Sequence, residues 1–456
     1  MTQDIFGQPI SLDAGPALDS WNAMQLAFMA HSAATPTHLA ATLSAAPGFA
    51  LAHAVKGMFH ILLGRREFIA TAAEAAEMAR AALAIAPATQ REIALVGALD
   101  DWLAGRVRET LATFERLLAA NPGDTLVVKL DHALRFVLGD SPGMRRMIEQ
   151  ALPAHGDDHP GRGYVLGCHA FALEETGAFE LAHSTGHRAL KLCPDDAWGL
   201  HAVAHVHDMT ADAQGGLDWL AGREGAWAHC NNFRFHVWWH KALMHLDLGQ
   251  TDAVLALYDD EIRKEKTDDY RDISNATSLL MRLELDGVKV GDRWGELADL
   301  SEDRTEDGCL IFADLHYMLA LVSDDRTDAV TTLMGRLHRD ARAQSSYMHR
   351  AMAQPGLSAA AGLVAFGDGK YDIAFLNLAR ARKTMQQAGG SHAQRDVFER
   401  LTIDSAIRSG FLDEAETILT DRTAHRAGRE DGYAAVRRQL IARGRDAACA
   451  GRVPAE

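Results

Sequence analysis

The chain has 456 residues, and its 46 Lys and Arg side chains against 62 Asp and Glu give a formal charge of −16. This acidic balance argues against a nucleic-acid-binding protein, whose binding surface is basic. Apolar residues make up 48% and charged residues 24%, a composition typical of folded rather than disordered chains. With 80 alanines and only 7 tyrosines, the composition favours stacked helices.

Residues 1–45 are expected to form an N-terminal helical cap. The first residues lack the basic and apolar stretches of a secretory signal. No segment approaches the roughly 18 apolar residues that a membrane helix needs. We therefore expect a cytoplasmic protein with no membrane partner, and reduced thiols at its five cysteines, which lie at positions 168, 193, 230, 309 and 449.

Residues 46–195 show a repeat. Prolines at 47, 87, 122, 160 and 194 are 34 to 40 residues apart, close to the period of tetratricopeptide helix pairs of about 34 residues. Gly64, Gly105, Gly139 and Gly177 divide each unit into two helices. Ala182 and its counterparts Ala189, Ala374, Ala381 and Ala415 follow such glycines at positions where paired helices approach closely. The sequence predicts an all-α, tetratricopeptide-like α-solenoid.

Residues 196–350 continue the helical periodicity without prolines, as degenerate helix pairs that carry most of the histidines. Predicted helices cover 197–209, 215–220, 233–248, 252–261, 273–285 and 310–321, and the acidic stretches 267–272 and 301–308 are predicted to be loops or turns. Residues 351–456 are predicted to form further tetratricopeptide-like pairs and a capping helix. No sheet is expected.

Histidine is in local excess. Twelve of the 22 histidines lie between residues 155 and 245. Two predicted helices carry His-x-x-x-His, with His201 and His205 on one and His236 and His240 on the other. Because side chains four residues apart share one helix face, each pair could chelate a metal, bind an anion or relay a proton. His183 and His187 have the same spacing, but they fall on a second helix of a pair, and we interpret their spacing as coincidence.

The two His-x-x-x-His helices are both first helices of consecutive pairs, which line the concave side of such repeats. We therefore expect the two pairs to face each other, with His316 on a later first helix. The structural alternative is a set of interior histidines packed against Trp198, Trp238 and Trp239.

Acid–base chemistry is the reaction class that these histidines favour. Neither pair is His-Glu-x-x-His, so the general base of zinc peptidases is missing. Neutral histidines suit proton transfer and need a carboxylate, such as Asp208, Asp272 or Asp314, to fix the tautomer. No cofactor is predicted, and zinc or iron held by the same four histidines is the alternative.

A second polar segment, Gly389–Asp396, precedes a predicted helix. Its Ser391, Gln394, Arg395 and Asp396 could cap the helix and hold a carboxylate or phosphate at the helix start. The structural interpretation is plain helix capping with an Arg–Asp surface pair.

Several segments together resemble the tetratricopeptide repeat protein 38 family. They are His201–Met209, Phe235–Leu243 with Tyr258-Asp259, Asp272–Arg282, Gly287–Trp294, Phe312–His316 and Gly389–Phe398. The resemblance implies an all-α superhelix and no established general reaction. Asp208 stands where the family shows Glu, which shortens the reach of that carboxylate.

The sequence thus predicts a central pocket that binds a small polar molecule, anionic or of amide type, with hydrolysis or other acid–base chemistry as the expected reaction. A non-catalytic scaffold that binds a peptide or protein is the alternative, and a homodimer is expected in either case. The candidate catalytic residues are His201, His205, His236, His240, Asp272 and His316, and the candidate substrate-binding residues are Trp239, Asn275, Gln394, Arg395 and Asp396.

Overall fold

The predicted all-α fold is confirmed in a computed structural model, which describes the backbone of residues 2–450 and side chains up to residue 447. The sheet within this range is one antiparallel pair, β1 (Thr2–Gln3) and β2 (Pro9–Ile10), in which Thr2 pairs with Ile10. The chain divides into two compact units, which are described separately. Unit 1 comprises Met1–Val203, Gly222–Arg234 and Ser345–Met348, and unit 2 comprises Ala204–Ala221, Phe235–Gln344 and His349–Glu456.

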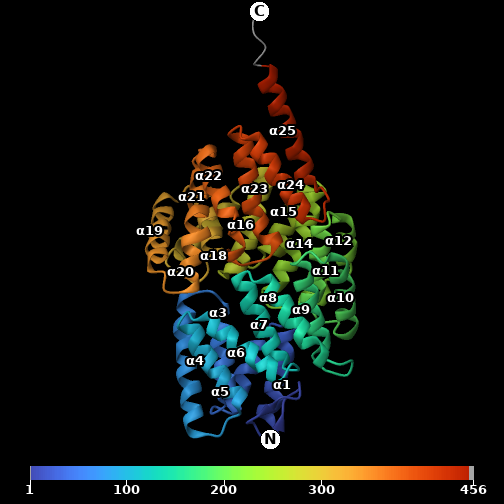
Figure 1. Cartoon of the computed structure of the whole chain (residues 1–456), viewed down its shortest axis with the longest axis vertical. Coiled ribbons are helices and arrows are strands. Elements are labelled where there is room, and N and C mark those ends of the chain that lie inside the picture. Colours follow the sequence, from blue (N-terminus) through green and yellow to red (C-terminus); the bar gives the residue numbers. More distant parts are fainter. Residues whose placement is uncertain (1, 451–456) are drawn as a thin grey trace, which may run out of the picture. The chain divides into compact units, whose positions relative to one another are not determined.

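Unit 1 consists of consecutive helices that run back and forth (Figure 1). They are α1 (Pro16–Met29), α2 (Thr35–Ala45), α3 (Ala50–Leu62), α4 (Arg66–Ile85), α5 (Gln90–Leu103), α6 (Val107–Ala120), α7 (Thr125–Leu138), α8 (Ser141–Ala151), η1 (Leu152–Ala154), α9 (Arg162–Glu174), α10 (Phe179–Leu192) and α13 (Gly225–Ala228).

The sequence signals for helix pairs hold in unit 1. The four glycines predicted to divide the pairs all have positive φ, from 62° to 80°, which glycine adopts without strain. Ala182 and Ala189 on α10 are fully buried, as expected where α10 packs on α9. Apolar side chains of the paired helices form a continuous core that includes Trp21, Phe114 and Phe171. Close stacking of small residues therefore explains much of the alanine content.

Unit 2 continues the pattern. Its elements are α12 (Ala213–Leu220), α15 (Thr251–Leu257), η2 (Tyr258–Ile262), α16 (Tyr270–Leu285), α17 (Arg293–Asp303), α18 (Ile311–Ser323), α19 (Thr327–Ala343), η3 (Met352–Gly356), α21 (Leu357–Gly367), α22 (Tyr371–Arg382), η4 (Met385–Ala388), α23 (His392–Arg408), α24 (Leu412–His425) and α25 (Gly432–Ala450). Three helices pass from one unit to the other, namely α11 (Ala197–Met209), α14 (Phe233–Asp247) and α20 (Tyr347–Ala351).

Two predicted loops are partly wrong. Residues 270–272 form the first turn of α16, because Asp269 caps this helix by accepting a hydrogen bond from the backbone N–H of Arg271. Residues 301–303 are the last turn of α17, a helix that the acidic composition of this stretch had concealed. The four predicted segments, with boundaries at 45, 195 and 350, remain a prediction, and residues 451–456 of the last one lie outside the described residues.

Buried ion pairs join the last three helices of unit 2. Asp396 on α23 accepts from Arg422 on α24 at 2.6 Å, and Arg422 also binds Asp431, which precedes α25. Arg437 on α25 binds Asp404 on α23. Charged pairs that are buried and multiply hydrogen-bonded fix the relative positions of the helices that carry them.

Within residues 2–450, no helix is both long and apolar enough to cross a membrane. Cys168, Cys193, Cys230 and Cys309 form no disulfide among the described residues. Cys449 lies outside the described side chains.

Candidate functional site

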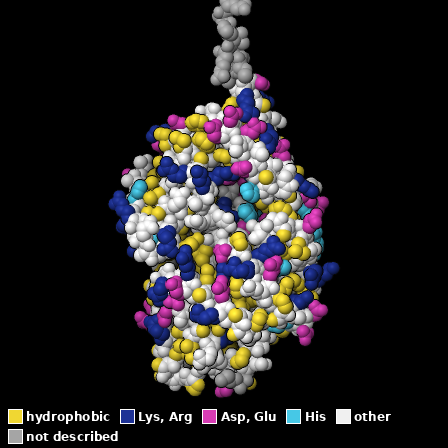
Figure 2. Space-filling view, viewed as in Figure 1, with side chains coloured by type: hydrophobic (Ala, Val, Ile, Leu, Met, Phe, Trp, Pro, Cys, Tyr) yellow, Lys and Arg dark blue, Asp and Glu magenta, His cyan; other side chains and the backbone are white. Residues whose placement is uncertain are grey.

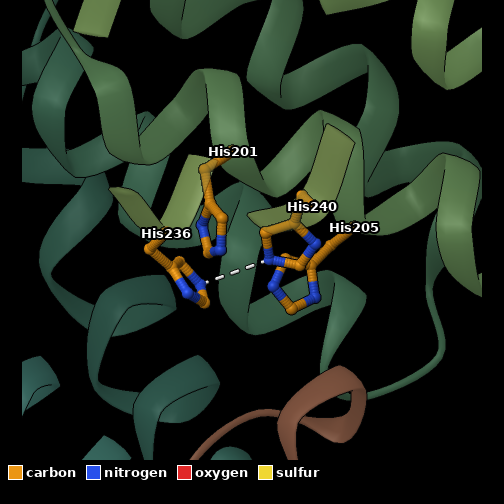
Figure 3. Close-up of side chains that lie close together, drawn as sticks. All are labelled: His201, His205, His236 and His240. Atoms are coloured by element: carbon orange, nitrogen blue, oxygen red, sulfur yellow. Dashed lines mark hydrogen bonds between the residues drawn. The ribbon is translucent and has the colours of Figure 1, made fainter. Parts of the chain in front are cut away.

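Within unit 2, His205 on α11 lies close to His236 and His240 on α14 (Figure 3). His205 and His240 are fully buried, and their ring centroids are 4.3 Å apart. Nε2 of His236 is 3.2 Å from Nε2 of His240, one turn away on α14. His201 lies one turn before His205 on the continuous helix α11. His205, His236 and His240 each offer one ring nitrogen, and these nitrogens lie within 4.8 Å of one another.

An amide fixes the orientation of His236. Nδ1 of His236 lies 3.2 Å from Oδ1 of Asn275 on α16, and Nε2 of Gln394 donates to the same oxygen at 3.4 Å. Because an amide oxygen only accepts, His236 donates through Nδ1 and its Nε2 carries a lone pair. His240 then donates to that lone pair through its own Nε2. Asn275 and Gln394, two predicted substrate-binding residues, therefore position a predicted catalytic one.

Burial keeps these histidines neutral. Loss of solvent, followed by the nearby His205, lowers the pKa of His236 to about 3 and holds the pKa of His240 well below its usual range. His236 is nevertheless the member of the group with partial exposure, since His201, His205 and His240 are all at most 1% exposed. Ligands or ions would therefore meet His236 first. The indole ring of the buried Trp239 stacks on the His236 ring at 5.3 Å.

Arg282 is a buried cation beside this group. Its guanidinium is 1% exposed, lies 5.5 Å from the centre of the Trp239 ring and donates to the backbone oxygens of Ser278 and Ala393 at 3.1 and 2.6 Å. Asp396, the carboxylate paired with it, is 4.0 Å away. Burial, and then Arg400, lower the pKa of Arg282 to about 9.

Arg282 is not among the site residues predicted from the sequence. The available signal was its spacing of seven residues from Asn275, which places both on one face of α16, toward the start of α23.

His316 on α18 lies near Arg282 but takes part in different contacts. Its Nδ1 is 2.8 Å from the backbone oxygen of Phe312, to which it donates, and its ring packs against Phe398. Burial lowers the pKa of His316 to about 4, with Arg282 contributing in the same direction. No protein atom among the described residues hydrogen-bonds its Nε2.

The carboxylates expected to orient a histidine have other partners. Asp208 binds Arg426 at 2.9 Å, and Asp314 forms a buried pair with Arg336. Asp272 accepts a hydrogen bond of 2.5 Å from Thr267, and burial together with Asp269 raises the pKa of Asp272 to about 7. For His236 the orienting role belongs to the Asn275 amide instead.

The polar segment Gly389–Asp396 has a structural function as well as a place at the site. Ser391 and Gln394 form a capping box at the start of α23. Nη1 of Arg395 donates to the backbone oxygens of Gly389 and Gly390, so this guanidinium holds the turn. Asp396 does not form the predicted surface pair with Arg395, because it binds Arg400 and Arg422 instead. These two cations hold the pKa of Asp396 well below its usual range.

A cleft of about 390 Å³ opens among α22, α23 and α24 of unit 2. Its lining includes five Lys or Arg side chains, two carboxylates and two histidines, which are Arg382, Lys383, Arg395, Arg422, Arg426, Asp396, Glu399, His392 and His425. On the face shown in Figure 2, Lys, Arg and His side chains gather around a hollow in this region. Asp396 and Phe398 both line the cleft. Asp396 also lies 4.0 Å from Arg282, and the ring of Phe398 packs against that of His316.

No family model matches the sequence. Among solved structures, the chain is similar to one described as the structure of Naa15/Naa10 bound to HypK-THB, with a TM-score of 0.26 and 11% sequence identity. The match covers 90% of this chain, which spans 64% of the length of the matched one.

Proposed function

We propose that this protein binds a small molecule with a carboxylate or phosphate group in the cleft among α22, α23 and α24. The observation that carries the proposal is the charge of the lining. Cationic side chains outnumber carboxylates by three in the cleft, whereas the whole chain has a formal charge of −16. A concave surface with an excess of positive groups on an acidic chain attracts anionic ligands.

The size of the cleft supports a small ligand. Small-molecule sites in proteins have volumes of about 300–1,000 Å³, and this cleft has about 390 Å³. Arg382 is partly neutralised by Glu399 and Asp421, and Arg422 by Asp396 and Asp431. Arg426 is paired with Asp208 and Asp431. These pairs hold the guanidinium groups in place.

Lys383, the C-cap of α22, also lines the cleft and forms no ion pair within the described part of the chain. Its ammonium group is thus available to an anion. We assign the main electrostatic contact with the ligand to Lys383.

Acid–base chemistry on the bound molecule, such as hydrolysis, is the second part of the proposal. Gln394 connects the cleft with the histidine group. It lies beside Arg395, which lines the cleft, and donates a hydrogen bond to Asn275, which also accepts one from His236. His236 and His240 do not line the cleft, so they are candidate proton-transfer groups only through this chain of hydrogen bonds. The motifs shared with the tetratricopeptide repeat protein 38 family include these residues, and we propose membership of that family on this basis.

A thermal-shift screen tests the binding proposal. The probes are inorganic phosphate, succinate and N-acetylglycine. Each of the two organic acids is compared with its uncharged amide as a control. At a concentration 100 times Kd, binding contributes about 2.7 kcal/mol, which raises the Tm of a chain of this length by about 3 °C. We expect the anions to raise Tm and the amides to leave it unchanged.

Lys383→Ala should reduce the shift, and Lys370→Ala is the matched control. Lys370 is the N-cap of the same helix, is 60% exposed and pairs with Asp368 on the surface. The proposal is wrong if no anion raises Tm, or if Lys383→Ala responds as the wild type does. Binding of an extended acidic peptide without any response to small anions would favour the scaffold alternative.

A further inference from the structure

We propose that Nε2 of His236, together with His205 and His240, binds one divalent transition-metal ion, with zinc as the expected ion. The site is separate from the cleft and is tested without any anionic ligand. Imidazole nitrogens are suitable ligands for zinc, iron, nickel and copper, whereas Mg²⁺ and Ca²⁺ prefer oxygen. Three histidines are also a ligand set that leaves a position open for water or substrate, as in catalytic zinc sites.

The distances fit a shared ion. Zinc–nitrogen bonds of about 2.0–2.1 Å in tetrahedral geometry place two ligand nitrogens about 3.3 Å apart. The two Nε2 atoms of α14 are 3.2 Å apart, and the ring of His205 is in contact with that of His240. Two imidazole nitrogens that face each other at this distance either share a proton or share a cation, and in the cation-bound form the proton of His240 is carried on its Nδ1 instead. All candidate nitrogens lie within 4.8 Å of one another, so small rotations of the rings suffice.

The surroundings of His236 are those of a metal ligand. Metal-binding histidines use one ring nitrogen for the ion and donate the other N–H to a fixed acceptor. In His236, Nδ1 donates to Oδ1 of Asn275, which leaves the Nε2 lone pair directed toward His240. Gln394 donates to the same oxygen and holds the amide in this orientation. Asn275 is therefore a positioning residue for the proposed site.

Helix geometry explains why the site forms. His236 and His240 are one turn apart on α14, so the backbone holds both on one face without any loop. His205 comes from α11, which places the third nitrogen on a second rigid element. His183 and His187 on α10 have the same spacing, with ring centroids 4.5 Å apart, but have no place in this group. This second pair provides an internal control.

The charge balance links the ion to the proposed function. Three imidazoles are neutral ligands, and the cation of Arg282 is close enough to His240 to affect it. A dication here is favoured by an additional anion. This part of the inference rests on the proposed function, and it predicts that the anion identified in the thermal-shift screen strengthens Zn²⁺ binding. In the metal-bound protein His236 and His240 hold the ion rather than transfer protons.

The experiment uses the full chain without an affinity tag. After treatment with EDTA and its removal, Zn²⁺ is titrated against a competing chelator, and Co²⁺ is added separately to record visible absorption. We expect one ion per chain and the visible bands of four-coordinate Co²⁺. His240→Ala and His236→Gln should lose the ion, and Asn275→Ala should bind it 10- to 100-fold more weakly. His183→Ala/His187→Ala should bind as the wild type does.

The outcomes separate this inference from the proposed function. Circular dichroism establishes which variants are folded, and if His240→Ala is not, the less buried His236→Gln decides. Absence of a stoichiometric ion, or equal affinity in His236→Gln and the wild type, overturns the metal site. Loss of the ion in the His183→Ala/His187→Ala variant would assign the metal site to α10 instead. Anion binding by the EDTA-treated protein would still support the cleft, whereas a metal site without anion binding would leave only this inference standing.

Discussion

The stability of the protein should fall with acid partly because of His316. Its pKa is about 4 in the folded chain, compared with about 6.5 when unfolded. Between these values the unfolded chain binds a proton that the folded chain does not, so the free energy of unfolding decreases as pH falls. Each unit of difference between the two pKa values corresponds to about 1.4 kcal/mol. The loss attributable to His316 is therefore about 2 kcal/mol at pH 5 and approaches about 3 kcal/mol near pH 4.

The assay is urea unfolding of the wild type and of His316→Gln at pH 7, 6 and 5. Gln preserves polarity at this position but has no proton to gain, so the variant should lose about 2 kcal/mol less than the wild type between pH 7 and 5. His338→Gln serves as a control, because this histidine is on the exposed face of α19. If wild type and His316→Gln lose the same stability over this range, the reasoning about burial of His316 is refuted.

Two further predictions concern unit 2. Asp314→Ala leaves the buried Arg336 with only Asp340, 3.6 Å away, and should cost about 3 kcal/mol in chemical denaturation. A loss below about 1 kcal/mol would show that the pair is solvated. Gly390→Ala should lower Tm more than Gly428→Ala: both have φ above 70°, but only at Gly390 would the new Cβ lie 2.6 Å from the Phe312 ring. Equal losses in the two glycine variants would contradict the packing described around Gly390.

Much of the fold could be predicted because its signals are local. The proline spacing, the turn glycines and the small residues after them correspond to helix pairs, and predicted helix 197–209 has the bounds of α11. Residues 293–303 were missed because their acidic composition resembles a loop, although Trp294 and Leu297 supply the apolar face of α17. Composition averages over a segment, whereas a helix needs only one apolar stripe.

The candidate site could be predicted only in part. The i, i+4 spacing places His236 and His240 on one face, and this relation needs no tertiary information. Two other features depend on which helices are neighbours. They are the hydrogen bond between Asn275 and His236, 39 residues apart, and the proximity of Arg282 to Asp396. The roles of Arg395 and Asp208 could not be read from residue type, because a guanidinium that holds a turn and one that binds a ligand look the same in sequence. The homodimer remains a prediction.

The most direct test of the central claim is the affinity of the cleft for the anion that gives the largest thermal shift. Calorimetric titration would compare the wild type with Lys383→Ala and Lys370→Ala, whose lysines stand at opposite ends of α22. Loss of one charge-assisted contact, about 1.4 kcal/mol, should raise Kd about tenfold in Lys383→Ala. Lys370→Ala should stay within about twofold of the wild type. Equal affinities in all three proteins would contradict the assignment of the cleft as the anion site.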